Sequence, residues 1–130
     1  MVLSCMDPRF QNLVYNHLKK KKLTGKYSAF TIAGAAVGVT HSKFKKWHNT
    51  FYDNLATSIQ LHKIEKLIVI NHKDCGAAKI ANGKKEFTPE NEKKIHQDSF
   101  KKLKKEINKR FPKIKVELNV ISLDSKITKF

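Results

Sequence analysis

The chain has 130 residues, of which 40% are hydrophobic, and a formal net charge of +16 from 27 basic and 11 acidic residues. This length predicts one domain, residues 1–130, that can bury a core without covalent cross-links. No apolar run approaches the roughly 20 residues of a transmembrane helix. The first residues, MVLSCMDPR, lack the basic and long apolar regions of a signal peptide, so we expect a cytoplasmic protein without a membrane partner.

The positive charge is almost entirely lysine, since every basic residue except Arg9 and Arg110 is a lysine. A basic surface could attract nucleic acid. Nucleic-acid readers, however, use arginine where planar, bidentate contacts matter, and lysine does not supply them. We therefore interpret the lysines as solvated surface and expect no nucleic-acid partner.

The first part of the chain predicts a strand, a helix and a second strand. MVLSC is a short apolar run, and residues 9–22 carry apolar side chains at helical spacing. Asp7 is the predicted N-cap of this helix, Pro8 lies in its first turn, and Gly25 ends it. Residues 26–32 favour a strand, which a glycine- and alanine-rich turn follows.

The same alternation continues to the end of the chain. Residues 43–62 carry a helical apolar stripe that includes Trp47, and residues 66–72 are a continuous apolar run typical of a central parallel strand. Thr88 is the predicted cap of a third long helix, which stops before Pro112 and is followed by the strand-like KVELNVISLD. We predict an α/β fold with a mostly parallel sheet of about four or five strands flanked by helices.

Two of the predicted strands end in residues that can bind metal. Cys5 follows the first strand, and His72 and Cys75 follow the third. Carboxyl ends of neighbouring parallel strands meet at one edge of a sheet, so the three side chains could converge there. Two thiolates and an imidazole suit Zn²⁺ and leave its fourth position open. Two buried thiols and a strand-end histidine without a metal would give the same pattern.

Asp7 and Arg9 alternate with Cys5 along the chain. Asp7 could take the fourth metal position, or it could pair with Arg9 and leave the metal open. The planar guanidinium fits a carboxylate bidentately and lysine does not, so an arginine in this lysine-rich chain indicates a role for that group. The alternative is an ordinary solvent-exposed arginine in the first turn of a helix.

Taken together, these motifs resemble the β-class carbonic anhydrases. The family pattern is Cys-x-Asp-x-Arg, then Ala-Gly, then His-x-x-Cys-Gly, and this chain has CMDPR, Ala33-Gly34 and HKDCG. The resemblance spans nearly the full chain. It departs from the family at Thr31-Ile32, where the family often has Arg-Asn or Arg-Thr, and at Asn71, where it usually has Gly. The family's N-terminal helical arm is not matched before Cys5, so we expect a minimal form.

The resemblance implies a zinc-dependent lyase that reversibly hydrates CO₂ to bicarbonate and a proton through a zinc-bound hydroxide. Cys5, His72 and Cys75 would hold Zn²⁺, Asp7 would orient the hydroxide, and Arg9 would hold Asp7 away from the metal. It also implies a homodimer or higher homo-oligomer. Two alternatives stay open: a zinc hydrolase of a CO₂-like sulfur compound (carbonyl sulfide or carbon disulfide), and a non-catalytic zinc-binding or basic nucleic-acid-associated protein of the same fold.

The remaining polar and glycine positions receive simpler interpretations. Gly34 and Gly38 do not fit a dinucleotide-binding loop, and we expect them to allow close packing of the turn near the metal ligands. Five histidines lack partners that the sequence identifies, and we expect them on surface or helix faces: His17, His41, His48, His62 and His96.

Overall fold

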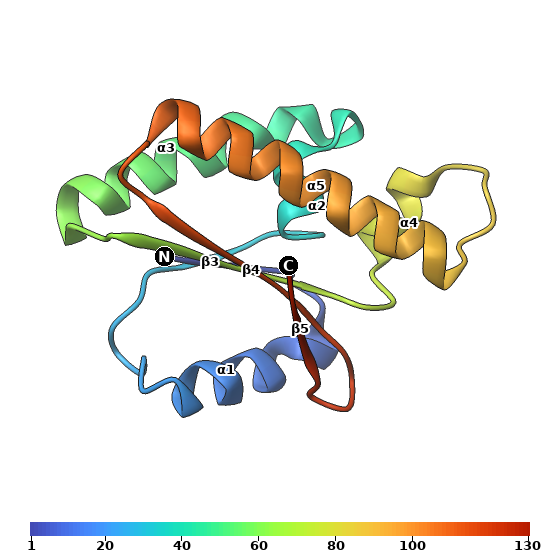
Figure 1. The fold of residues 1–130 in the computed structure, drawn as a ribbon, viewed down its shortest axis with the longest axis horizontal. Helices are drawn as coiled ribbons and strands as arrows, with labels where there is room; N and C mark the ends of the chain where they lie inside the picture. The colour runs from blue at the N-terminus through green and yellow to red at the C-terminus, as the bar shows by residue number, and fades with distance from the viewer.

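A five-stranded sheet separates two layers of helices in the computed structural model, which describes residues 1–130 (Figure 1). The strand order is β2-β1-β3-β4-β5; the first four listed below are parallel, and the last runs antiparallel to β4. The strands are β1 (Val2–Ser4), β2 (Ala29–Thr31), β3 (Lys66–His72), β4 (Lys115–Ile121) and β5 (Ile127–Lys129). The predicted α/β class with a mostly parallel sheet is confirmed.

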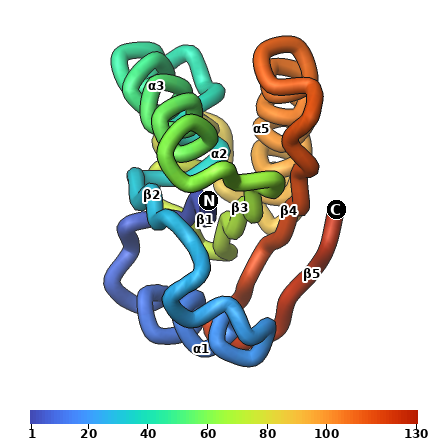
Figure 2. Tube along the Cα trace, turned by 90° about the vertical axis from the view of Figure 1, so that its left-hand side faces the viewer, coloured from blue at the N-terminus to red at the C-terminus, as the bar shows by residue number.

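The helices cover the two faces of the sheet unequally. One face carries α1, and the other carries α2, α3, α4 and α5 (Figures 1 and 2). Their bounds are α1 (Gln11–Lys20), α2 (Ala36–Thr40), α3 (Lys45–His62), α4 (Gly76–Asn82) and α5 (Pro89–Arg110), with 3₁₀ turns η1 (Pro8–Phe10) and η2 (Ser42–Phe44) before α1 and α3. None of these helices combines the length and the apolar character that a membrane crossing requires.

The central strand β3 contributes to the core on both sides of the sheet. Leu67 and Val69 belong to a cluster of 22 buried residues under α2, α3 and α5, whereas Ile68 and Ile70 belong to a cluster of seven under α1. Successive side chains of a strand point to opposite faces, so a strand covered on both sides must be apolar throughout. This burial explains why residues 66–72 form a continuous apolar run.

The predicted cap of α5 is present, and Asp7 caps the 3₁₀ turn η1 that leads directly into α1, not α1 itself. The Asp7 carboxylate accepts a hydrogen bond from the Arg9 backbone N–H, and the Thr88 hydroxyl accepts one from Asn91. The first helix is shorter than predicted: it ends at Lys20, and both Lys22 (φ 59°) and Gly25 (φ 74°) take the left-handed conformation after it. Gly25 therefore has the conformation expected of it, but the left-handed residue next to the helix end is a lysine.

Two elements were missing from the sequence-based prediction. The glycine- and alanine-rich segment expected to be a turn contains α2, which is only five residues long and almost completely buried against its neighbours. Strand β5 is a three-residue edge strand, mostly exposed, that pairs with β4 across a turn closed by Ser122 N–H and the Lys126 carbonyl. Tertiary packing and pairing stabilise both elements, and neither carries a strong local pattern.

Gly38 allows the chain to pack closely inside α2. A Cβ atom at this position would overlap the backbone carbonyl oxygen of Ala33, which cannot move aside as a side chain could. Gly76 differs, because a Cβ atom there would meet nothing within 4 Å.

We expect Gly38→Ala to lower the free energy of unfolding by about 1–3 kcal/mol, the usual cost of overpacking a buried site. Urea unfolding of the apo-protein measures this change. Gly76→Ala is the matched control and should leave the unfolding free energy close to that of the wild type. Equal stability of the two variants would contradict the close approach at Gly38.

Candidate metal site

Three potential metal ligands converge at the carboxyl edge of the sheet. The ligand atoms of Cys5, His72 and Cys75 all lie within 4.8 Å of one another, and all three residues are buried. The convergence follows from topology: β1 and β3 are paired in parallel with Ser4 opposite Ile70, so both chains leave the sheet at the same edge. Cys75 is added by the tight loop that leads from β3 into α4.

The orientation of His72 fits a metal ligand. Its Nδ1 lies 2.8 Å from the Lys73 carbonyl oxygen, to which it can only donate a hydrogen bond. The neutral ring therefore carries its lone pair on Nε2, which is buried and has no hydrogen-bond partner. A buried acceptor without a partner is costly, and a bound cation would satisfy it. The set of one imidazole nitrogen and two sulfurs suits a divalent metal of intermediate softness.

The pKa values of the two thiols shift in opposite directions. The Cys75 thiol and the Gly34 backbone N–H, whose nitrogen lies 3.2 Å from the Cys5 sulfur, lower the pKa of Cys5. The neighbouring Cys5 sulfur and burial raise the pKa of Cys75. The two thiols are thus inequivalent, and a metal cation that binds both sulfurs would require both to be deprotonated. Gly34 reaches this position with φ +79°, which explains the glycine of the Ala-Gly turn.

Arg9 forms a fork that joins the two ligand-bearing loops. Its Nη2 lies 2.8 Å from Asp7 Oδ2 and its Nε lies 3.2 Å from Asp7 Oδ1. The same guanidinium donates from Nη1 to Asp74 Oδ2 at 2.9 Å and from Nη2 to the Asp74 carbonyl at 3.0 Å. Of the two arrangements considered for Asp7, the structure has the pairing with Arg9.

Asp7 is thereby held beside the ligand cluster as a carboxylate. Its Oδ2 lies 3.8 Å from His72 Nε2. Hydrogen bonds from Arg9 lower the pKa of Asp7 to about 2, so the group is ionised at neutral pH. The cluster therefore has a fixed negative charge and a hydrogen-bond acceptor at its edge.

Asp74 is a part of this site that sequence reasoning missed. It has a left-handed backbone with φ 56°, a conformation that Asp tolerates better than most residues because its short side chain can bond locally. Its position in the sequence between His72 and Cys75 could have indicated that Asp74 belongs to the site. The conformation turns the chain sharply enough to bring Cys75 back toward His72, and Arg9 holds it.

His96 was expected on a surface or a helix face, and the structure places it on a buried face of α5. It is only 2% exposed and lies behind the ligand cluster, with Asn71 Nδ2 at 2.9 Å from its Nδ1. The position of Glu92 one helical turn earlier was a signal, because residues four apart on a helix share a face.

A family model described as "Putative carbonic anhydrase" matches residues 1–128 of this chain. An uncharacterised protein of Rickettsia conorii is 27% identical over 125 residues, which are 95% of this chain and 67% of that protein. An uncharacterised protein of Rickettsia bellii is 27% identical over 128 residues, which are 98% of this chain and 78% of that protein. Both similarities extend over almost the whole chain.

Solved structures of β-carbonic anhydrases have a similar fold. A structure from a study of two tetrameric β-carbonic anhydrases of Sordaria macrospora superposes with a TM-score of 0.61 at 10% identity, covering 99% of this chain and 78% of that one. The β-carbonic anhydrase CafA of Aspergillus fumigatus superposes with a TM-score of 0.60 at 11% identity, covering 99% and 73% respectively. At such low identity these likenesses show a shared fold.

The fork made by Arg9 predicts a specific effect of Arg9→Lys. A single ammonium cannot hold Asp7 and both Asp74 oxygens at once, so the loop that carries Cys75 should open more often. We expect backbone hydrogen exchange at residues 73–76 to become several-fold faster. Arg110→Lys, which changes an arginine paired with Glu106 inside one helix, should leave exchange in this loop unchanged. Unchanged exchange in Arg9→Lys would contradict the fork's role.

Proposed function

Because this chain belongs to the family described as "Putative carbonic anhydrase", we propose that it catalyses the reversible hydration of CO₂ to bicarbonate and a proton. We propose that the cofactor is a zinc ion held by Cys5, His72 and Cys75. The observation that carries the proposal is the convergence of these three buried ligand atoms within 4.8 Å. The membership in the family and the fold shared with β-carbonic anhydrases support it.

The donor atoms of the site fit zinc. Two sulfurs and one imidazole nitrogen make a three-residue ligand set that leaves a fourth position for water or substrate. When bound, zinc would supply a Lewis acid that makes water a nucleophile near neutral pH. The hydrogen bond from His72 Nδ1 to the Lys73 carbonyl keeps the lone pair of Nε2 directed into the site.

Asp7 has the geometry and the charge to orient the attacking water. Its ionised carboxylate can only accept hydrogen bonds, so it would take one from the water and direct the free lone pair of the oxygen toward CO₂. Arg9 would restrain this carboxylate through its forked contacts, so that Asp7 does not itself become a metal ligand.

We further propose that the chain works as a homo-oligomer, a homodimer or a larger assembly. The support is the fold shared with the Sordaria macrospora enzymes, which are described as tetrameric. The exposed apolar side chains of Met6 and Ile80, which flank the ligand-bearing segments in the sequence, are 63% and 58% exposed and could be covered by a second copy.

The activity is tested by stopped-flow CO₂ hydration with zinc-loaded protein. We expect a rate clearly above buffer, and we expect Asp7→Asn to lower kcat/KM by about 100-fold, because the attacking water is no longer held in the productive orientation. The control is Asp53→Asn, which changes an exposed aspartate of α3 and should retain the wild-type rate. A protein that binds zinc stoichiometrically but does not exceed the buffer rate would refute the proposed reaction.

The ligand set is tested by metal affinity. We expect Cys75→Ser and His72→Asn each to weaken zinc binding by more than about 100-fold, which is the upper range for residues that only support ligands. His62→Asn changes an exposed histidine at the end of α3 and should keep full affinity. Chelator competition gives the dissociation constants. Stoichiometric, tightly held zinc in Cys75→Ser would exclude this residue as a ligand.

A further inference from the structure

A chain of buried polar contacts connects α5 to the loop that carries Cys75. The Ala36 backbone N–H donates to Asn71 Oδ1 at 3.0 Å, and Asn71 Nδ2 lies 2.9 Å from His96 Nδ1. His96 Nε2 faces Glu92 Oε1 at 3.7 Å, and the same carboxylate oxygen accepts the Cys75 backbone N–H at 3.1 Å. The contacts thus run from α2 through β3 and α5 to a proposed metal ligand.

The direction of each contact follows from the first one. A backbone N–H can only donate, so it fixes the Asn71 oxygen on the α2 side and turns the amide NH₂ toward His96. His96 Nδ1 must therefore accept, and the neutral ring carries its proton on Nε2. This nitrogen lies 3.7 Å from Glu92 Oε1, beyond hydrogen-bond distance, so the N–H dipole and the carboxylate attract each other at longer range.

The Cys75 N–H needs an acceptor from outside its own helix. Cys75 is the N-cap of α4, and the first N–H groups of a helix have no partner within it. The Cys75 side chain makes no capping hydrogen bond, whereas Glu92, whose side chain is 13% exposed, reaches this end from α5. The preceding residue, Asp74, is in the left-handed conformation, so the loop is held in an uncommon shape by Arg9 on one side and Glu92 on the other.

We propose that Glu92 is a positioning residue that fixes the Cys75 loop in its metal-binding geometry, and that His96 and Asn71 hold Glu92 in place. The proposal rests on the metal site of the proposed function but concerns metal retention, a property separate from catalysis. Removing the acceptor leaves the Cys75 N–H unsatisfied, and the loop must then rearrange to find another partner. The sulfur of Cys75 moves with its backbone, so metal affinity falls.

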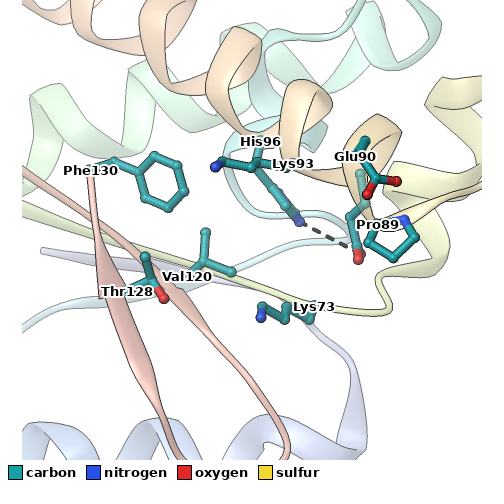
Figure 3. A pocket seen from close by; sticks show the side chains of 9 residues that line it. Lys73, Pro89, Glu90, Lys93, His96, Val120, Thr128 and Phe130 are labelled. Carbon is teal, nitrogen blue, oxygen red and sulfur yellow. Dashed lines mark ion pairs between the residues drawn. The ribbon is translucent and has the colours of Figure 1, made fainter.

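A second metal site at His96 and Glu92 is the main alternative use of this pair. Both residues line a cavity of about 410 Å³ between α5 and strands β4 and β5, into which Lys73 and Phe130 also project (Figure 3). The hydrogen-bond directions argue against a metal there, because His96 Nε2 carries a proton and has no lone pair to offer. The adjacent Lys73 and Lys93 would also repel a cation.

Glu92→Ala tests the proposal through zinc affinity and the absorption spectrum of the cobalt-substituted protein. We expect zinc affinity to fall by about 10- to 100-fold, the range for residues that orient metal ligands, and the cobalt bands to shift. Glu92→Gln can keep an oxygen at the position of Oε1 and so the acceptor for Cys75, but it loses the negative charge that faces His96, so its zinc affinity should be intermediate. Glu92→Gln also preserves the volume of the side chain, so it can be measured if the alanine variant does not fold.

The control is Glu90→Ala, which removes another carboxylate that lines the same cavity but does not contact the Cys75 loop. It should match the wild type in zinc affinity and in cobalt spectrum. A purely structural role for Glu92 would lower the thermal midpoint of the apo-protein while leaving both metal readouts unchanged, and that result would overturn the proposal. Equal losses in Glu90→Ala and Glu92→Ala would overturn it as well, since the effect would then be one of charge alone.

Two substitutions at His96 separate its two contacts. His96→Asn places an oxygen near the position of Nδ1 and keeps the contact with Asn71, but it removes the donor that faces Glu92. His96→Gln places its NH₂ near the position of Nε2 and keeps that donor. We expect zinc affinity to be weaker in His96→Asn than in His96→Gln, and the reverse order would overturn the role given to His96.

The outcomes distinguish this inference from the proposed reaction. A wild-type protein that binds zinc tightly but does not hydrate CO₂ would refute the reaction, while the affinity series would still support or overturn the role of Glu92. Normal CO₂ hydration together with wild-type zinc affinity in Glu92→Ala would support the reaction and overturn the positioning role. A wild-type protein without affinity for zinc would overturn both.

Discussion

The parallel pairing of β1 with β3 is the constraint on which the candidate site depends. These two strands are separated by more than 60 residues of chain, yet their register places Ser4 opposite Ile70. Cys5 and His72 therefore leave the sheet at the same edge, and a short loop is sufficient to bring Cys75 to them. A shift of one residue in this register would turn each side chain to the other face and separate the ligands.

The loops that follow these strands are held by charged side chains. Arg9 contacts Asp7 on its own loop and Asp74 on the other, so one guanidinium connects the segments after β1 and β3. Glu92 approaches the second loop from α5 and accepts the Cys75 N–H. Since Asp74 lies in the left-handed region, its loop needs such contacts to persist in one conformation.

The face of the sheet decides what surrounds each ligand. His72 lies in line with Ile68 and Ile70 on the α1 face, where its ring stacks on Phe10 with centroids 4.1 Å apart. Asn71 points to the opposite face and reaches His96 on α5. β-class carbonic anhydrases usually have glycine at the position of Asn71. In this chain the Asn71 amide connects α2 with α5 behind the ligands, which a glycine could not do.

Several features could be predicted from the sequence because they depend on local patterns. The continuous apolar run of β3 and the capping residues Asp7 and Thr88 are short-range signals, and they gave the α/β class and the main helices. Neighbouring strand ends and residue chemistry were enough to suggest that Cys5, His72 and Cys75 lie together. Spacing alone could not distinguish a metal site from buried thiols without a metal, since both have the same residues at the same spacing.

The tertiary structure alone decided the features that depend on contacts between distant segments. Helix α2 and strand β5 form because neighbours bury the one and pair with the other, and neither has a periodic pattern of its own. The burial of His96 and the reach of Glu92 to Cys75 depend on how α5 crosses the end of β3. A sequence specifies which groups can donate and accept hydrogen bonds, but the packing of helices on the sheet determines which of them meet.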